Sequence, residues 1–343
     1  MQHKHYKNKG LTGLKNLGNT CYINSCMQIL SHTYELNDFL NDDKYKKRLN
    51  DTHDSALLLE WDNLRKLMWS DNCIISPGKF VQTIQKLSAI KKNPQFTGFQ
   101  QNDLPEFLLF LIDCFHTSLK REVKMKIVGK EETPTDKLAS ECYKMIQQMY
   151  TKDYSEIWNL FYGVHVSHIH SLQSHEELSR TPEPFFMINL PIPTKIKEPT
   201  LKECFDEYVS GEHLTGDNAW HNEKTGERED VKKSIQYWSL PKILCIDLKR
   251  FNGNGNKNQK MVTFPVEDMD LSPYVIGYKN TSYVYTLYGV GYHSGGTLGG
   301  HYYAATKNAN GKWYMFNDTD VTEIKNTDTI VTPKAYCLFY RKK

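Results

Sequence analysis

The 343-residue sequence predicts an α+β fold, with helices in its first part and a largely antiparallel sheet in its second half. Up to about residue 118, apolar side chains recur at helical spacing between turn signals. From about residue 157 onward, short β-branched and aromatic runs alternate with Pro, Gly and Asn clusters, which is typical of strands. We expect an active site in the cleft between the two parts.

The first helix is predicted to begin at or just before Cys21, after the turn-forming pair Gly18-Asn19. Either Asn19 or Thr20 can cap its N-terminus. A later buried helix is predicted over 104–119, because Asp103 and Glu106 form a capping box and Pro105 is tolerated in a first helical turn. Two further helical patterns lie at residues 56–68 and 80–87.

The polar stretch 131–153 contains Pro134 and is predicted to be a surface insertion. Strand candidates follow at 185–190, 243–248, 283–292 and 313–316.

Cys21 is placed where a protein can make a reactive thiolate. The unpaired N–H groups and partial positive charge of a helix start favour the thiolate, so we expect its pKa to fall below the free value of about 8.5. The alternative is a small buried core residue, which is what most free cysteines are.

A cysteine nucleophile needs an imidazole as base and an amide or carboxylate to hold that imidazole in one tautomer. His301, followed by Asn317 and Asp318, supplies these residue types downstream of Cys21, in the order found in papain-like enzymes. The order alone is weak evidence, because the chain has 13 histidines and eight cysteines.

The segment from His301 to Asp318 reads as a β-hairpin with its turn around 308–311. An even number of turn residues puts Asp318 on the face of His301, whereas an odd number puts Asn317 there. The dipeptide Asn310-Gly311 favours the even turn.

Five blocks in this order resemble the ubiquitin-specific proteases, a papain-like family of deubiquitinating enzymes. The blocks are 13–25, 101–108, 240–251, 299–318 and 335–340. The resemblance covers about residues 11–340. It implies a papain-like cysteine protease fold forming one catalytic domain, 11–343, after a short polar tail, 1–10. The implied parts are a helical thumb (about 11–120), β fingers with adjoining palm strands (about 163–240) and an antiparallel β palm (about 241–343).

The resemblance also implies the role of each catalytic residue. Cys21 attacks the substrate carbonyl, and His301 acts as base and then acid. Asn317 orients His301, and Asp318 is a second polar partner nearby. Asn16 donates a hydrogen bond to the oxyanion, although a turn asparagine is the plainer interpretation.

The implied partners are ubiquitin and ubiquitinated proteins. Asp103 is expected to hold an arginine of the ubiquitin tail as well as to cap its helix. Glycines before His301 are expected to form a loop over the tail, whose two terminal glycines fit a narrow channel. The substrate-binding residues expected are Asp103, Gln101, Gly299, Gly300 and Tyr302. Pro105 stands where relatives often carry a polar residue, so one tail contact is expected to be missing.

We expect no metal and no cofactor. Many members of the resembled family bind a structural zinc through two C-x-x-C pairs, and this sequence contains none. A histidine cluster near one expected position consists of His165, His168, His170 and His175.

Composition excludes other classes. The 43 basic and 40 acidic residues give a net charge of +3 without a basic stripe, which argues against nucleic-acid binding. The longest apolar run, 107–112, is too short to span a membrane, and scattered cysteines suggest a reducing, intracellular compartment. Two rival functions stay open: hydrolysis at a related modifier, and an inert ubiquitin-binding module.

Overall fold

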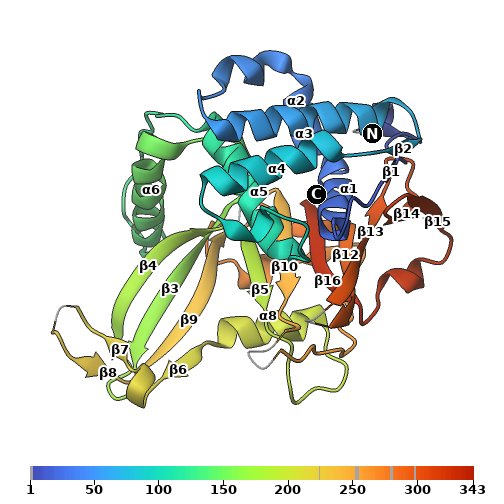
Figure 1. Cartoon of the computed structure of the whole chain (residues 1–343). Coiled ribbons are helices and arrows are strands. Elements are labelled where there is room, and N and C mark those ends of the chain that lie inside the picture. Colours follow the sequence, from blue (N-terminus) through green and yellow to red (C-terminus); the bar gives the residue numbers. More distant parts are fainter. Residues whose placement is uncertain (1–2, 224, 252–254, 279–280, 297–298) are drawn as a thin grey trace.

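Figure 1 shows the computed structural model of the chain, which describes residues 3–223, 225–251, 255–278, 281–296 and 299–343. Helices α1 to α5 gather at the top of the view, and two larger sheets extend below them. This arrangement confirms the predicted α+β class. We keep the names thumb for the helical part, palm for the sheet beside it and fingers for the sheet that projects away.

The helices begin and end close to the sequence signals. They are α1 (Cys21–Ser31), α2 (Tyr34–Asn41), α3 (His53–Ser70), α4 (Gly78–Ile90), α5 (Leu104–Leu119), α6 (Pro134–Asp153), α7 (Glu156–Phe161) and α8 (Leu201–Ser210). Helix α5 has the predicted bounds, and the Asp103 carboxylate accepts the Glu106 N–H at 3.2 Å. Within the described residues, no helix is both long and apolar enough to cross a bilayer.

The polar stretch predicted as an insertion is the 20-residue helix α6. Thr133 and Asp136 form a reciprocal capping box around Pro134, which explains why the helix starts there. One apolar face of α6 packs with two tryptophans and with two valines of the fingers sheet. This small cluster contains Leu138, Ala139, Cys142, Trp158, Val164, Val166 and Trp238. The insertion therefore supports the fingers.

The palm is an eight-stranded sheet with the order β15-β14-β13-β12-β16-β10-β5, and β11 pairs with β12. Its strands are β5 (Met187–Leu190), β10 (Ile243–Leu248), β11 (Met269–Asp270), β12 (Val284–Gly296), β13 (Gly299–Lys307), β14 (Trp313–Asn317), β15 (Asp320–Ile324) and β16 (Ala335–Lys342). The pairs are antiparallel except for β5 with β10. Helix α1 packs against β13 and β12, which brings Cys21 to the palm.

The fingers sheet is antiparallel with the order β4-β3-β9-β6, and a separate hairpin joins β7 to β8. Its strands are β3 (Gly163–Ser171), β4 (Glu177–Phe185), β6 (Glu212–Leu214), β7 (Trp220–His221), β8 (Arg228–Glu229) and β9 (Val231–Ser239). The predicted strand 185–190 is divided, because β4 ends at Phe185 and β5 starts at Met187. Two-residue strands β1 (Gly13–Leu14) and β2 (Ile74–Ile75) pair in the thumb.

Within the tail predicted at 1–10, the structure describes residues 3–10, and Tyr6 is packed against the thumb, which corrects the expectation that this segment is only a polar tail. Tyr6 is 4% exposed and stacks on Tyr34, with Trp69 at its edge. The sequence around Tyr6 is polar and gives no sign of this packing, because the aromatic partners Tyr34 and Trp69 lie far along the chain.

Candidate active site

Cys21 is the first residue of α1 and lies against strand β13. The preceding turn uses left-handed backbone at Gly18 and Asn19, so the helix begins at the sulfur as predicted. The side chain is 3% exposed, and the backbone N–H of Tyr302 donates a hydrogen bond to it. Since Tyr302 follows His301, the nucleophile and base candidates come from adjoining elements.

The pKa of Cys21 is raised, which corrects the expectation that it would fall. Burial is the largest cause, and the nearby Asp318 carboxylate adds to it. Backbone N–H groups of Tyr302, Tyr22 and Cys21 itself lower the pKa, as expected of a helix start, but they do not offset burial. The thiol is therefore favoured in the free protein, and forming the thiolate requires a base.

His301 is held by Asn317. The imidazole Nε2 lies 2.6 Å from the Asn317 Oδ1, and an amide oxygen can only accept, so Nε2 carries the proton. The neutral imidazole then has its acceptor at Nδ1, where it can take a thiol proton.

The hairpin register explains why Asn317 is the partner of His301. Lys307 is opposite Trp313, and Gly311 closes the turn by donating to the carbonyl of Asn308 at 2.9 Å. Three residues, 309–311, lie between the hydrogen-bonded Asn308 and Lys312, so the turn is odd. The even turn suggested by the Asn-Gly pair is wrong, because Gly311 supplies the left-handed residue (φ 87°) of a three-residue turn.

Asp318 faces two asparagines of the thumb. Its carboxylate accepts from Asn16 Nδ2 at 3.1 Å and from Asn24 Nδ2 at 2.8 Å. The Asn16 Oδ1 accepts from the backbone N–H groups of Gly18 and Thr20 at 3.0 and 3.1 Å, in the turn that leads to Cys21. The Asn16 amide is therefore fixed on both sides, and its NH2 group still has a second hydrogen to donate.

Gln101 links the thumb to the glycine-rich hairpin of the palm. Its side-chain amide donates to the Gly300 carbonyl at 3.0 Å and accepts the Gly300 N–H at 2.9 Å. A side chain at Gly300 would put its Cβ 2.1 Å from the ring of His293, so only glycine fits there. Gly299 pairs with Gly296 at the end of the hairpin; residues 297 and 298 of the expected loop lie outside the described residues.

A pocket of about 750 Å³ lies between thumb and palm beside these residues. Its lining includes Gln101, Asp103, Tyr302, Tyr336 and Asp247. The Asp103 Oδ2 accepts from Tyr336 at 2.7 Å and from Tyr302 at 3.3 Å, and burial raises the pKa of this carboxyl. The pocket therefore brings together the expected substrate-binding residues Gln101, Asp103 and Tyr302.

Asp247 is a pocket residue that sequence reasoning missed. Burial, followed by the charge of Asp103, raises the pKa of Asp247 to about 7. One oxygen, Oδ1, is buried and has no hydrogen-bond partner among the described residues. Asp247 is the one half-exposed residue of β10, whose other residues are buried and apolar. An acidic residue inside the apolar run 243–248 was the available sequence signal.

Among the described residues, no group of three or more His, Cys, Asp or Glu side chains is arranged to hold a metal ion. Two histidines of the β3 cluster pair with glutamates instead: the His165 Nε2 lies 3.3 Å from the Glu183 Oε2, and the His168 Nδ1 lies 2.6 Å from the Glu177 Oε1. The arrangement around Cys21 instead combines a thiol, an oriented imidazole and a fixed amide. This set suits acyl transfer through a thioester.

The sequence matches a known family over almost its whole length. Residues 12–340 fit the family described as "Ubiquitin carboxyl-terminal hydrolase". The chain is 33% identical to "Ubiquitin carboxyl-terminal hydrolase 2" of Rattus norvegicus, over 97% of this chain and 54% of that protein. It is 32% identical to "Ubiquitin carboxyl-terminal hydrolase Usp2" of Drosophila melanogaster, over 98% of this chain and 35% of that protein. It thus spans about half or less of these curated relatives.

Solved structures have the same fold. A chain in a SAGA DUB module bound to monoubiquitin, which contains Ubp8, has a TM-score of 0.72 and 24% identity, covering 98% of this chain and 70% of that one. A second, in "Structure of the SAGA Ubp8/Sgf11/Sus1/Sgf73 DUB module bound to ubiquitin aldehyde", has a TM-score of 0.73 and 23% identity, covering 100% and 72%.

Proposed function

The chain belongs to the ubiquitin carboxyl-terminal hydrolase family, and we propose that it is a cysteine-dependent deubiquitinase. It hydrolyses the isopeptide or peptide bond that follows the C-terminal glycine of ubiquitin. The observation that carries this proposal is the hydrogen bond between Asn317 and His301, which lies on the strand that contacts Cys21. Similar folds were solved with monoubiquitin and ubiquitin aldehyde, which supports ubiquitin as the partner.

The first step forms a thioester. The Nδ1 of His301 takes the proton of the Cys21 thiol, and the sulfur attacks the carbonyl carbon of the ubiquitin terminal glycine. The carbonyl electrons move onto the oxygen, which Asn16 Nδ2 stabilises by a hydrogen bond. The C–N bond then breaks, and His301 gives its proton to the leaving amine.

Water completes the cycle. His301 takes a proton from the water as the oxygen attacks the thioester carbonyl, and the C–S bond breaks. The thiolate receives the proton, which restores Cys21 and releases the ubiquitin carboxyl group. Because burial favours the neutral thiol, His301 is required in both halves of the reaction.

The tail of ubiquitin is proposed to lie in the pocket beside Gln101 and the glycine hairpin. Two terminal glycines suit this place because the hairpin presents Gly296, which has no side chain, to the pocket. Asp103, with its two tyrosine donors, then faces the basic part of the tail.

The test is hydrolysis of a fluorogenic amide at the C-terminus of ubiquitin, run beside the same amide on related modifiers. We expect turnover with ubiquitin and at least about tenfold lower kcat/KM with the others. A preference for another modifier would reassign the substrate. Tight ubiquitin binding without turnover would instead support the inert-module alternative.

We predict that ubiquitin affinity rises with pH around 7 because of Asp247. Its pKa of about 7 means that the carboxyl becomes charged as the pH rises through this value, which strengthens its attraction for a cationic tail. Asp103, Lys249 and Arg250 also act on this carboxyl. In the Cys21→Ala background, where no chemistry interferes, we expect the Kd to fall about three- to tenfold from pH 6 to pH 8.

The matched control is Asp247→Asn in the same background. It keeps the shape of the side chain but has no charge to gain, so its Kd should be nearly constant over this pH range. An unchanged pH dependence in Asp247→Asn would exclude Asp247 as the responsible group.

A further inference from the structure

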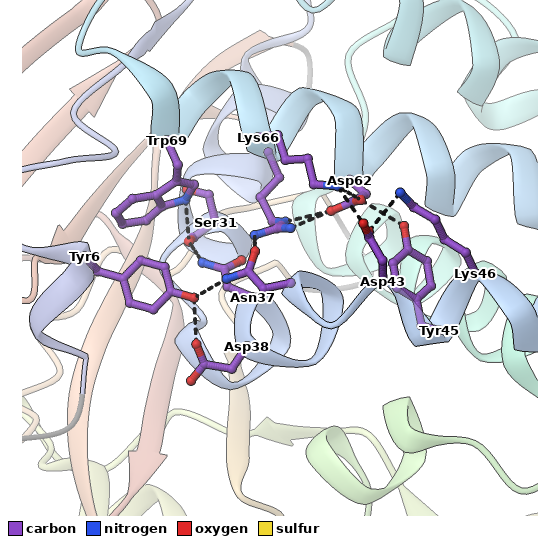
Figure 2. Close-up of polar contacts among 12 residues, drawn as sticks. Tyr6, Ser31, Asn37, Asp38, Asp43, Tyr45, Lys46, Asp62, Lys66 and Trp69 are labelled. Atoms are coloured by element: carbon purple, nitrogen blue, oxygen red, sulfur yellow. Dashed lines mark hydrogen bonds and ion pairs between the residues drawn. The ribbon is translucent and has the colours of Figure 1, made fainter.

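Residues 3–10 are fixed to the thumb through Tyr6. Its ring stacks on Tyr34 with centroids 4.7 Å apart, and Trp69 contacts its edge at 4.9 Å. Its hydroxyl donates to Asp38 Oδ1 at 2.7 Å, as Figure 2 shows. A ring held on two sides and at its hydroxyl is a firm anchor.

The anchor continues into a polar network of the thumb (Figure 2). Asn41 donates to the Tyr6 hydroxyl at 3.0 Å and accepts from Arg65 at 2.9 Å. Arg65 pairs with Asp62, and both side chains are 2% exposed. Trp69 donates to the carbonyl of Ser31, the last residue of the helix that starts at Cys21. Tyr6 is thus tied to the frame that holds the nucleophile.

Asn8 joins this segment to the palm. Its carbonyl accepts from Asn72 of the thumb at 2.9 Å. Its N–H donates to Asn308 Oδ1 at 3.1 Å, and its side chain accepts from Asn310 at 2.7 Å. Asn308 also donates to the Lys9 carbonyl at 2.8 Å. Asn8 has a φ of 59°, a conformation that asparagine tolerates better than most residues.

The palm partners belong to the turn of the hairpin that carries His301 and Asn317. Asn308 follows the last residue of β13 and is 2% exposed, which makes its contacts with residues 8 and 9 part of the protein interior. At the other end of the same hairpin, the Asp318 carboxylate binds Asn16 and Asn24. The hairpin is therefore attached to the thumb at both ends.

We propose that residues 3–10 act as a clasp that fixes the catalytic hairpin against the thumb, with Tyr6 and Asn8 as positioning residues for the proposed reaction. Attachment at two ends prevents the hairpin from tilting relative to α1. His301 then keeps its distance to Cys21 throughout turnover. A small displacement between reacting groups is costly, about 10²-fold for 1 Å.

The test compares Tyr6→Ala and Asn308→Ala with the control Tyr45→Ala. Tyr45 is also a buried tyrosine that donates to a thumb aspartate, Asp62 at 2.9 Å (Figure 2). Because Asp62 pairs with Arg65, this variant perturbs the polar network of the thumb while the side chains of Tyr6 and Asn8 stay in place. With the ubiquitin amide, at a temperature where all variants are folded, kcat should fall about three- to tenfold in the first two variants. KM should stay within about twofold of wild type, and Tyr45→Ala should keep the wild-type kcat.

The double variant Tyr6→Ala/Asn308→Ala should be no slower than the slower single variant, because both substitutions open the same clasp. Tyr6→Phe, which keeps the stacked ring but loses the hydroxyl's bonds to Asp38 and Asn41, should show a smaller loss and serves if Tyr6→Ala does not fold. Equal kcat in wild type, Tyr6→Ala and Asn308→Ala, or additive losses in the double variant, would overturn the positioning role.

Hydrogen exchange tests the clasp independently of the proposed function. The turn amides of Gly311 and Lys312 donate to Asn308 and Asn310. Their exchange should accelerate about tenfold in Tyr6→Ala and not in Tyr45→Ala. Unchanged exchange in Tyr6→Ala would contradict the clasp even if the protein hydrolyses ubiquitin amides, whereas a protein without hydrolysis but with this exchange pattern would keep the clasp and refute the function.

Discussion

Cys21→Ala is expected to abolish hydrolysis of the ubiquitin amide, lowering kcat by at least about 10⁴-fold. The sulfur is the only atom that can form the thioester, so neither His301 nor Asn16 can compensate for its loss. Ubiquitin affinity should change less than about threefold, because the substitution removes one buried atom and we propose that thumb, palm and fingers all contribute to binding. Steady-state kinetics and calorimetric titration measure the two effects.

Cys73→Ala is the matched control, because Cys73 is the exposed cysteine among the eight. A small alkylating reagent should modify Cys73 faster than the buried Cys21. Cys73→Ala should nevertheless hydrolyse ubiquitin amide at the wild-type rate. Substantial turnover by Cys21→Ala would mean that another group is the nucleophile.

Asn317→Ala should be more damaging than Asp318→Ala. In Asn317→Ala the imidazole of His301 loses the acceptor that fixes its tautomer. We therefore expect kcat to lose much of the rate enhancement that a positioned acid-base group contributes, which is about 10²–10⁴-fold. Asp318 bonds to Asn16 and Asn24, so its loss should resemble that of Asn16→Ala. We expect Asp318→Ala and Asn16→Ala each to lower kcat by no more than about 10²–10³-fold, which is the typical cost of removing one hydrogen-bond donor to the oxyanion.

The combined variants separate the two roles. Asn16→Ala/Asp318→Ala should be about as slow as Asn16→Ala alone, because both residues position one amide. Asn317→Ala should also change the pH profile of kcat, since it acts on the imidazole. If Asp318→Ala is clearly slower and Asn317→Ala keeps most activity, our assignment of the third catalytic residue is wrong. A loss of affinity without loss of kcat in Asn16→Ala would refute its oxyanion role.

Local sequence signals were sufficient to predict where two of the helices begin. Pro105 and the Asp103 cap define the start of α5, and the Gly18-Asn19 turn defines the start of α1. The family blocks selected Asn317 over Asp318. The turn dipeptide pointed the other way, because an Asn-Gly pair serves both a two-residue turn and the end of a three-residue turn.

Other features depend on contacts between distant segments. The raised pKa of Cys21 results from burial and from Asp318, which lies 297 positions away along the chain and reaches the thiol only when the hairpin docks. From the sequence alone Tyr6 is interpreted as part of a polar tail, whereas in the folded chain it packs against Tyr34 and Trp69. Asp247 lines the pocket together with Asp103, which comes from a distant segment, and burial followed by the charge of Asp103 raises the pKa of Asp247. No local pattern encodes these neighbours.

The most direct test of the account is covalent labelling by ubiquitin that carries a C-terminal electrophile, followed by peptide mapping. We predict one modified residue, Cys21, while the exposed Cys73 stays free, because the proposed binding of the ubiquitin tail in the pocket beside Gln101 delivers the electrophile to Cys21. Cys21→Ala should not be labelled. Modification at Cys73, or labelling that persists in Cys21→Ala, would contradict the proposal that Cys21 is the nucleophile of a deubiquitinase.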